Sequence, residues 1–315
     1  MKILVTGGSG FLGSAVVRRL ASEHDVVVAD LREPAELPAG AVWERFDVTD
    51  AARVNEVIET ARPEVVVHLA SIVTPGKKSN RELEYAVDVD GTRHVLDACL
   101  AHDVRRIVVS SSGAAYGYHP DNPAWLTETD PVRGNEEFAY SHHKRLVEEM
   151  LAELRVSHPG FEQVVLRIGT ILGEAVDNQI TALFGWPVLL KVGGADSPFV
   201  FIWDTDVAAI IERGATGPAE AVTGITNVAG DGSMTMDEIA AVLGKRTVSV
   251  PTTALKAVLG VLKPLGLSAY GPEQTRFLQF RPVLANQRLR TTFGYVPGKT
   301  SREAFQAWVE AHPES

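Results

Sequence analysis

The chain has 315 residues, 45% of them hydrophobic and 22% charged, and a formal net charge of −10 at pH 7. A chain of this length can bury one large core, with or without a smaller lobe, and an acidic balance without a basic run argues against a nucleic-acid partner. The single cysteine, Cys99, excludes a disulfide within one chain and favours a reducing, cytoplasmic location.

The first predicted strand, Ile3–Val5, ends in a glycine-rich turn that opens directly into an amphipathic helix, Phe11–Ser22. The bare N-terminus of such a helix offers unpaired N–H groups and a partial positive charge, which suit a pyrophosphate. Gly7 allows the tight turn, Gly10 lets phosphates approach the main chain, and Gly13 lets the helix pack closely on the strand. The segment therefore predicts a dinucleotide-binding site.

Apolar strands alternate with amphipathic helices through the first half of the chain. Strands are predicted at Ile3–Val5, Val26–Ala29, Val42–Phe46, Val65–Leu69, Ile107–Ser110 and Val164–Arg167. Helices are predicted at Phe11–Ser22, Ala51–Thr60, Arg81–His102 and Ala139–Ser157. This alternation implies right-handed β-α-β crossovers, so we expect an α/β fold with a Rossmann-type, doubly wound parallel sheet.

Beyond about Ile168 the predicted elements become short. They are Phe199–Trp203, Val207–Arg213, Thr223–Val228, Met236–Leu243 and Gly271–Phe280. We predict a dinucleotide-binding Rossmann domain over residues 1–170 and a smaller C-terminal α/β substrate lobe over residues 171–315, segments of which can return to the sheet.

Membrane association is not expected. The N-terminus runs directly into the first strand and leaves no room for a signal peptide. The most apolar segment, Ala254–Leu267, is interrupted by Lys256, Lys263 and Pro264 and lacks the ~18 uninterrupted apolar residues of a transmembrane helix. We interpret it as a helix of the small lobe, with a surface membrane anchor as the less favoured alternative.

Asp30 ends the second predicted strand, 17 residues after Gly13. A carboxylate at this place accepts hydrogen bonds from the adenine ribose hydroxyls and repels a 2′-phosphate, which favours NAD over NADP. Arg32 keeps NADP open as an alternative, because a guanidinium two residues further on could accept that phosphate.

Tyr140 and Lys144 stand at i and i+4 of the predicted helix Ala139–Ser157, so they share one face and can address one point. A neighbouring ammonium and a cationic nicotinamide ring both favour a tyrosine phenolate, which would make Tyr140 useful as an acid or base. Lys144 also has donors to spare for ribose hydroxyls.

These motifs resemble the extended branch of the short-chain dehydrogenase/reductase superfamily, the NAD-dependent epimerase/dehydratase family. The resemblance is carried by T-G-x-x-G-x-x-G at residues 6–13, by S-S-S-x-x-x-Y-G at residues 110–117 and by Y-x-x-x-K at residues 140–144. It implies that Ser112, with Ser111 as the alternative, completes a catalytic triad with the tyrosine and the lysine.

The resemblance also implies which residues contact the cofactor. Asp47 and Val48 follow the third strand, where family members hold adenine, and Leu69-Ala70-Ser71 looks like part of the family's H-L-A-A segment. The full predicted set is Gly7, Gly10, Phe11, Leu12, Gly13, Asp30, Asp47, Val48, Leu69, Ala70, Ser71, Ser110, Tyr140 and Lys144.

Two departures from the family pattern stand out. Asp88 occupies the place of the asparagine in N-V-x-G-T, where it either alters a proton relay or merely replaces one hydrogen-bond acceptor. Family members that bind nucleotide sugars usually have an asparagine and an arginine where this chain has Thr170 and the segment Ala195–Pro198. Arg281 is the remaining lobe cation that could meet a diphosphate, although a surface arginine is the more ordinary interpretation.

Two functional hypotheses follow. The first is reversible hydride transfer between NAD and a secondary alcohol or ketone, in which Tyr140 moves the proton, Ser112 holds the oxygen and Lys144 orients the ribose. The alternative is a nucleotide-sugar 4-epimerase or dehydratase that retains and recycles NAD. A catalytically silent NAD-binding protein is disfavoured, because both the tyrosine and the lysine are intact.

The substrate is expected to be a small molecule. Pocket walls are predicted from Thr74–Lys78, Ala114–Tyr118 and Gly169–Asn178. An apolar set in and beyond these segments would suit a hydrophobic carbonyl compound; it comprises Thr74, Ile171, Phe184, Trp186 and Phe199.

Assembly and metal binding complete the expectations. The helices Gly91–His102 and Tyr140–Ser157 resemble those that pair two subunits of the family in a four-helix bundle, so a homodimer is expected. It would need exposed apolar side chains, for which the candidates are Leu146, Met150 and Leu154. No metal site is expected, because His142 and His143 lack a carboxylate or cysteine at ligand spacing.

Overall fold

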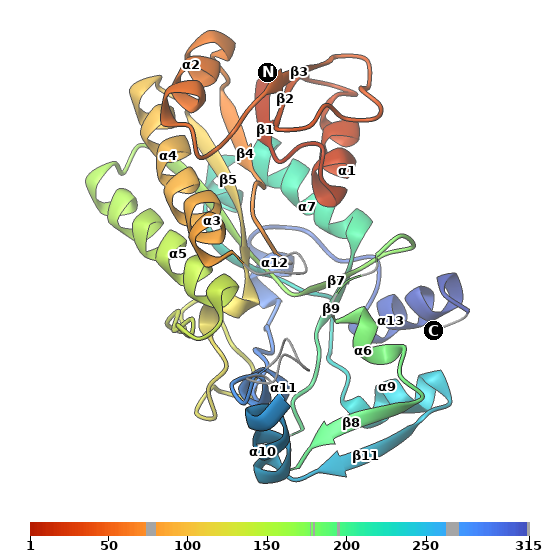
Figure 1. Ribbon diagram of the computed structural model, residues 1–315. Coiled ribbons are helices and arrows are strands. Elements are labelled where there is room, and N and C mark those ends of the chain that lie inside the picture. Colours follow the sequence, from red (N-terminus) through yellow and green to blue (C-terminus); the bar gives the residue numbers. More distant parts are fainter. Residues whose placement is uncertain (74–79, 177, 179, 194–195, 263–270, 314–315) are drawn as a thin grey trace.

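The computed structural model describes residues 1–73, 80–176, 178, 180–193, 196–262 and 271–313 (Figure 1). Its centre is a seven-stranded parallel sheet in the order β10-β6-β5-β4-β1-β2-β3. The strands are β1 (Lys2–Thr6), β2 (Asp25–Asp30), β3 (Ala41–Arg45), β4 (Val65–His68), β5 (Arg106–Ser112), β6 (Glu162–Ile168) and β10 (Gly224–Val228). This order confirms the predicted doubly wound, Rossmann-type sheet.

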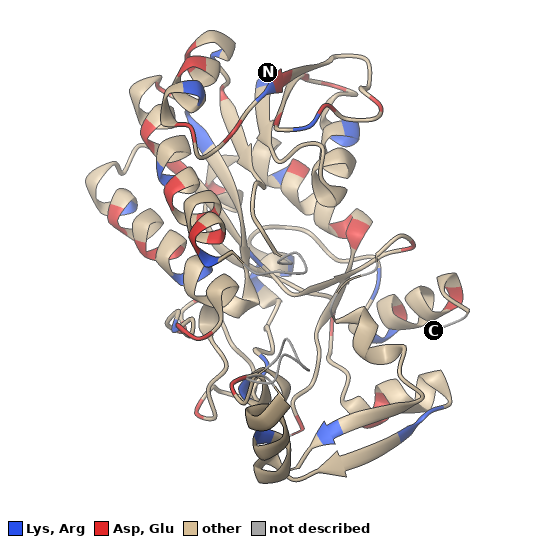
Figure 2. Cartoon of the chain, viewed as in Figure 1, with Lys and Arg blue, Asp and Glu red and all other residues tan. Residues whose placement is uncertain are grey.

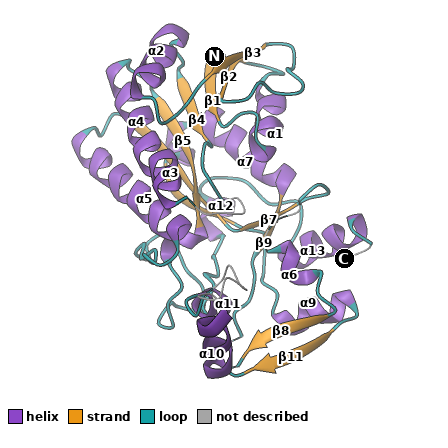
Figure 3. Cartoon of the chain, in the orientation of Figure 1, coloured by secondary structure: helices purple, strands orange, loops and turns teal. Residues whose placement is uncertain are grey.

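Helices cover both faces of the sheet (Figure 3). On one face lie α1 (Phe11–Leu20) and α7 (Asp204–Thr216); on the other lie α2 (Ala51–Ala61), α4 (Gly91–Ala101) and α5 (Ala139–Ser157). Each face of the sheet has its own hydrophobic core, and successive residues of a strand point to opposite faces. Val26 and Val28 pack on the face covered by α1, whereas Val27 packs on the face covered by α2. Burial on both faces explains why the strands are continuously apolar.

The long helix expected over residues 81–102 is divided into three. It consists of α3 (Arg81–Tyr85), one π-helical segment η1 (Ala86–Asp90) and α4. A π-turn accommodates one extra residue in a helix and often lies at a functional site. The side chains of Ala86–Asp90 therefore point in directions that differ from those expected for a regular α-helix.

The smaller lobe lies below the sheet in the view of Figure 1. It contains a parallel pair, β8 (Val188–Val192) and β11 (Arg246–Val250), with α6 (Thr181–Phe184), α9 (Met236–Leu243), α10 (Thr252–Leu262), α11 (Gln274–Gln279) and α13 (Ser301–Ala311). A second pair, β7 (Thr170–Leu172) and β9 (Phe201–Trp203), leads from the sheet into the lobe. The short elements α8 (Ala219–Val222), α12 (Gln287–Thr291) and the 3₁₀ turn η2 (Gly113–Tyr116) complete the chain.

The core of the lobe is aromatic. Phe184 contacts Phe199, Phe201 and Phe305 edge to face, with centroid separations of 5.2–6.2 Å. Phe184 and Phe199 are buried among these rings, whereas Trp186 is exposed. Phe184 therefore belongs to the core of the lobe and not to a pocket wall, while the role expected of Trp186 stays a prediction; Thr74 lies outside the described residues.

Charged side chains of both signs are interspersed along the helices α2, α4 and α5 (Figure 2). Of the apolar residues proposed for a dimer contact, Met150 is buried and Leu146 and Leu154 pack partly against the sheet core. The helix pair thus offers less free apolar surface than expected, and the homodimer stays a prediction. No helix in the described part of the chain has both the length and the apolarity to cross a membrane.

Candidate active site

The turn between β1 and α1 forms a cradle of bare backbone. Gly7 has a φ of +68°, and a Cβ on it would lie 2.8 Å from the Ala70 nitrogen. A Cβ on Gly13 would lie 2.1 Å from the Gly7 carbonyl oxygen, so only glycine lets the helix pack this closely. Within the described residues, the amides of Phe11 and Leu12 have no hydrogen-bond acceptor. These features fit a pyrophosphate at the helix N-terminus.

Asp30 lies beside this cradle at the end of β2. Its carboxylate accepts the Ser9 amide at 3.0 Å and the Arg32 amide at 3.1 Å, and its backbone carbonyl accepts the Trp43 indole N–H at 3.3 Å. The two amides fix the carboxylate next to the glycine turn while leaving lone pairs free, as a ribose contact requires.

A second wall of the cradle comes from the segment after β3. Val48 is buried, and a Cβ on Gly91 would lie 2.8 Å from its side chain, so the start of α4 passes directly over it. The Val48 carbonyl oxygen lies 2.9 Å from His94 Nδ1, and Asp47 accepts hydrogen bonds from Thr49. The position expected for an adenine contact is thus rigidly built.

His68 is a buried, neutral imidazole at the end of β4. The Thr92 hydroxyl donates to the Asp88 carbonyl oxygen at 2.6 Å, so it accepts a hydrogen bond from His68 Nε2 at 3.0 Å. His68 Nδ1 then accepts from the Thr6 hydroxyl at 2.7 Å, which itself accepts the amide of Leu69. Burial, followed by the charge of Lys144, lowers the pKa of His68 to about 3. This network holds the Leu69-Ala70-Ser71 segment in place.

The start of α5 is fastened to the end of β5 at two points. Lys144 Nζ donates to the Ser110 carbonyl oxygen at 2.9 Å, and the Ser141 hydroxyl donates to the Ala114 carbonyl oxygen at 2.7 Å. Ser112 lies between these two anchor points on the β5 side, and Tyr140 lies beside them on α5. Lys144 Nζ is 5.4 Å from the centroid of the Tyr140 ring. These two attachments hold the start of α5, with Tyr140 and Lys144, against the segment at the end of β5 that contains Ser112.

The structure distinguishes the two candidate serines. Ser111 is 2% exposed, and its hydroxyl donates to Glu148 at 2.5 Å. Ser112 is only half-buried, and its oxygen accepts the Ala114 amide at 3.1 Å, which leaves the hydroxyl proton free for a substrate oxygen. The geometry thus favours Ser112.

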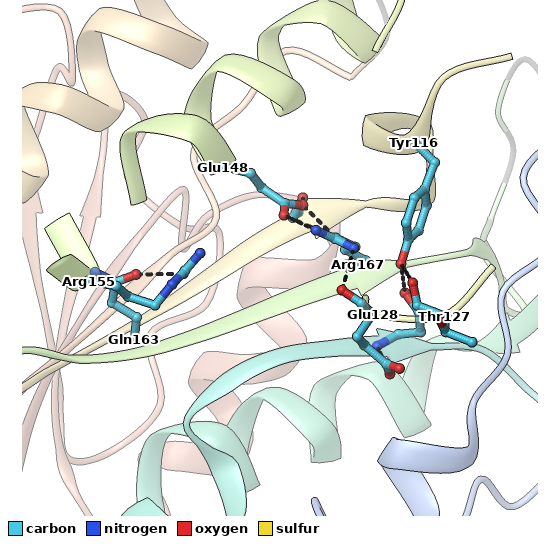
Figure 4. A network of polar contacts seen from close by, with 9 residues as sticks. Tyr116, Thr127, Glu128, Glu148, Arg155, Gln163 and Arg167 are labelled. Atoms are coloured by element: carbon cyan, nitrogen blue, oxygen red, sulfur yellow. Dashed lines mark hydrogen bonds and ion pairs between the residues drawn. The ribbon is translucent and has the colours of Figure 1, made fainter. Parts of the chain in front are cut away.

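Glu148, which accepts the Ser111 hydroxyl, belongs to a buried polar network (Figure 4). Arg167 of β6 makes a bidentate ion pair with Glu148 of α5, with its closest contact at 2.7 Å, and its guanidinium lies over the Tyr116 ring. The Tyr116 hydroxyl lies 2.7 Å from the Thr127 carbonyl oxygen and 2.8 Å from Asn227 Oδ1, and these two acceptors share its single proton. Tyr116 is therefore part of the core and is not a pocket wall, contrary to our expectation.

Asp88, in the π-turn, forms a pair that sequence analysis missed. His143 Nδ1 lies 3.0 Å from one carboxylate oxygen of Asp88, while the other accepts the Ser71 hydroxyl and the Ile72 amide, each at 2.9 Å. Although 55 residues separate Asp88 from His143, two signals could have suggested the pair: the acid in place of an asparagine and a histidine inside Y-x-x-x-K. No group of three possible metal ligands occurs among the described residues.

Arg281 lies against the aromatic wall of the lobe. Its guanidinium carbon is 3.8 Å from the Phe199 ring centroid and 5.4 Å from that of Phe277, and one nitrogen donates to the Ser197 carbonyl oxygen at 2.6 Å. Its Nε has no partner within the described part of the chain. Burial lowers the pKa of Arg281. Phe277 also packs edge to face against Tyr118, with ring centroids 5.3 Å apart, so Tyr118 belongs to the same aromatic wall. Within the described residues, the Arg281 guanidinium therefore has no carboxylate partner.

One predicted segment lies wholly, and two lie partly, outside the described residues. Thr74–Lys78 lies outside the described residues, as do Asp177 within Gly169–Asn178 and Ala195 within Ala195–Pro198. Phe11, the first residue of α1, is half-exposed.

Comparison with known proteins extends these observations. The model of the NAD dependent epimerase/dehydratase family matches residues 3–185. An uncharacterised protein of Mycobacterium tuberculosis is 25% identical over 312 residues, which cover 96% of this chain and 82% of that protein. UDP-glucose 4-epimerase of Mus musculus is 30% identical over 199 residues, covering 57% of this chain and 56% of the mouse protein.

Solved structures agree in fold. A short-chain dehydrogenase/reductase superfamily protein from Agrobacterium tumefaciens with bound NAD has a TM-score of 0.75 at 23% identity, covering 100% of this chain and 98% of that one. The UDP-glucose 4-epimerase of Thermus thermophilus in complex with NAD has a TM-score of 0.73 at 24% identity, covering 99% of both chains. With the family model matching more than half of its length, the chain belongs to the NAD dependent epimerase/dehydratase family.

Proposed function

We propose that this protein is an NAD-dependent enzyme that transfers hydride reversibly between the nicotinamide and a secondary alcohol or ketone. The observation that supports the proposal is the double attachment of the start of α5, which carries Tyr140 and Lys144, to the residues on either side of Ser112, through Lys144–Ser110 and Ser141–Ala114. The bare helix N-terminus and the fixed Asp30 carboxylate supply a matching seat for NAD.

Each residue of the triad has a separate task. Ser112 donates its hydroxyl proton to the substrate oxygen, while its own oxygen stays anchored by the Ala114 amide. Tyr140 accepts the hydroxyl proton of an alcohol or returns one to a carbonyl oxygen. Lys144 donates one hydrogen bond to the Ser110 carbonyl oxygen and retains other donors for ribose hydroxyls, and its ammonium nitrogen lies 5.4 Å from the centroid of the Tyr140 ring. Bound NAD supplies the hydride acceptor and, in its reduced form, the donor.

Selectivity for NAD is proposed to rest on Asp30. Two amides fix its carboxylate beside the cradle, where it would repel a 2′-phosphate. Arg32 is exposed, so NADP remains the alternative that a direct measurement has to exclude.

The second candidate is a nucleotide-sugar 4-epimerase or dehydratase, and Arg281 favours it. A guanidinium on an aromatic wall, near Tyr118 and without a carboxylate partner among the described residues, suits an anionic part of the substrate such as a diphosphate. The mouse relative is a UDP-glucose 4-epimerase, which points in the same direction.

The test combines Tyr140→Phe with analysis of the nucleotide that the protein carries. The purified enzyme is denatured, released NAD(H) and NADP(H) are quantified by mass spectrometry, and turnover is screened with alcohols, ketones and sugar nucleotides. We expect Tyr140→Phe to lower turnover by about 10²–10⁴-fold while NAD binding stays close to wild type. An unchanged thermal midpoint is the control for folding.

The outcomes separate the candidates. Near-stoichiometric NAD carried through purification supports the epimerase or dehydratase, because a recycled cofactor need not leave. An empty site that binds NAD reversibly supports net oxidation or reduction. Bound NADP would overturn the role given to Asp30, and retained turnover in Tyr140→Phe would remove that residue from the mechanism.

A further inference from the structure

The Asp88 carboxylate is a buried acceptor that meets donors from two distant parts of the chain. Its side chain is 2% exposed. One oxygen accepts the Ser71 hydroxyl and the Ile72 amide, each at 2.9 Å, and the other lies 3.0 Å from His143 Nδ1. His143 is itself 4% exposed, so the whole arrangement is shielded from competing water.

This arrangement requires a carboxylate at position 88. The Ile72 amide can only donate, so the oxygen that faces it has to accept. A carboxylate also accepts at its second oxygen, whereas an asparagine would present N–H groups to His143 Nδ1. Burial raises the pKa of Asp88, but the hydrogen bond from His143 is foremost among the effects that hold that pKa below its ordinary value. Asp88 is thus an ionised acceptor, and His143 donates to it from Nδ1.

The segment Leu69–Ile72, which we call the cofactor-side wall, packs directly on the glycine turn. A Cβ on Gly7 would lie 2.8 Å from the Ala70 nitrogen. The Ala70 amide donates to Thr6 Oγ1 at 3.3 Å, and the two residues that follow Ala70 both donate to Asp88. The wall is therefore held from the β1 side by Thr6 and from the π-turn by Asp88.

The histidine end of the arrangement lies on the catalytic helix. His143 stands three residues after Tyr140 and one residue before Lys144, so the three share little more than one turn of α5. The Tyr85 ring of α3 meets the His143 ring edge to face, with centroids 5.6 Å apart. The imidazole is thus fixed by a ring contact as well as by the carboxylate, and its place is tied to that of the start of α5.

We propose that Asp88 and His143 are positioning residues whose hydrogen bond holds the cofactor-side wall and the catalytic helix in fixed relative positions, so that NAD affinity depends on it. One carboxylate joins the π-turn, the wall and α5. Neither residue takes part in the chemistry. The inference rests on the proposed function only for the seat of NAD beside the glycine turn.

The test compares two variants of His143 that differ in one hydrogen-bond donor. The amide of His143→Asn can place an N–H close to the position of the imidazole Nδ1, whereas His143→Leu has no donor. The dissociation constant of NAD is measured by calorimetry on full-length protein from which bound nucleotide has been removed. We expect His143→Leu to raise it by about tenfold and His143→Asn to raise it by less than about threefold.

The neighbouring histidine provides a matched control. His142 precedes His143 on α5, and its side chain makes no hydrogen bond within the described part of the chain. His142→Leu should therefore leave the NAD dissociation constant within about twofold of wild type. An affinity in His143→Leu equal to that of wild type, or an equal loss in His143→Leu and His143→Asn, overturns the proposal.

A second measurement uses the wild-type protein labelled with ¹⁵N-histidine, in which the His143 signals are assigned by their loss in His143→Asn. We expect His143 Nδ1 to carry a proton. Because coupling between two equilibria is reciprocal, bound NAD should slow the exchange of this proton with solvent by about tenfold. An unprotonated Nδ1, or an exchange rate that NAD leaves unchanged, overturns the proposal even if His143→Leu fails to fold.

These readouts do not depend on turnover. If the His143 variants bind NAD as expected while Tyr140→Phe retains activity, the positioning role stands and the proposed reaction fails. If Tyr140→Phe is inactive and His143→Leu binds NAD like wild type, the reaction stands and the positioning role fails.

Discussion

The hydrogen bonds between Thr6, His68 and the Leu69 amide determine how the stability of the protein responds to pH at His68. Its Nδ1 accepts from Thr6, whose oxygen already accepts two backbone amides, so a proton on Nδ1 would meet no acceptor. Burial, followed by the charge of Lys144, lowers the pKa of His68 to about 3, and the missing acceptor also disfavours a proton on Nδ1.

A lowered histidine pKa predicts acid sensitivity. Between the unfolded pKa of about 6.5 and the folded pKa of about 3, the unfolded chain binds more protons, so stability is present above the window and is lost as pH falls. From pH 7 to pH 5 this one group should lower the free energy of unfolding by about 2 kcal/mol. In His68→Gln, the unfolding free energy should therefore fall by about 2 kcal/mol less than in wild type between pH 7 and pH 5. Urea unfolding at the two pH values measures this difference.

The comparison has an internal control. At pH 7 to 8, above the window, the difference in unfolding free energy between wild type and His68→Gln should stay constant. Parallel pH profiles from pH 8 to pH 5 would contradict a neutral buried His68.

The choice between Ser111 and Ser112 as the catalytic serine could not be made from residue identity. Three consecutive serines at the end of β5 cannot be ranked by their identity alone. Strand alternation turns Ser111 into the core toward Glu148, so that Ser110 and Ser112 face the other side. A partner 37 residues away in the chain decides which hydroxyl is free.

At the scale of elements, the pair Arg167–Glu148 joins β6 to α5 behind the triad (Figure 4). Both side chains are at most 4% exposed. Glu148→Gln would leave the Arg167 guanidinium buried with its charge uncompensated, which costs about 3–5 kcal/mol of unfolding free energy. Urea unfolding followed by far-UV circular dichroism measures this loss.

The neighbouring acid provides a matched control. Glu149 is 52% exposed and lies 3.6 Å from Arg145 on the surface of the same helix. Glu149→Gln should change the unfolding free energy by no more than about 0.5 kcal/mol. Similar losses in the two variants would show that the buried pair contributes no more than a surface pair.

Helix bounds were predicted best where a single helix buries one regular apolar face. The bounds of α5 and α9 agree with the predicted ranges, because regular apolar spacing runs through both to a clear end. The π-turn at Asp88 was not predicted, since tertiary contacts with Ser71 and His143 hold its extra residue. The helices α12 and α13 were missed because they are short or lie against a core formed by distant segments.

At the scale of the whole molecule, the second half of the chain completes the first. β10 pairs with β6 along its full length, and α7 packs against α1 over the sheet. Val207, Ile210 and Ile211 of α7 are fully buried in the core shared with β1 and α1. The sheet and its core therefore need segments beyond residue 170, namely β10 and α7.

This arrangement predicts that a shortened chain ending at residue 185, the end of the family match, will not fold cooperatively. It would lose β10, α7 and the core residues that they contribute, and so would expose an apolar face of the sheet. Urea unfolding and dye binding should show a broad transition and exposed apolar surface, against a sharp transition for the full chain. A sharp transition in the shortened chain would show that the N-terminal segment is an independent domain.

The sequence by itself determined the parallel sheet, the dinucleotide turn and the identities of the predicted triad. These features depend on local spacing: continuous apolar runs, glycines three residues apart, and a tyrosine and lysine one helical turn apart. Only the tertiary structure decided which serine is free, how Asp88 meets His143 and where Arg281 lies. Those relations join residues that are far apart in the chain, and they depend on packing between elements, which local periodicity does not encode.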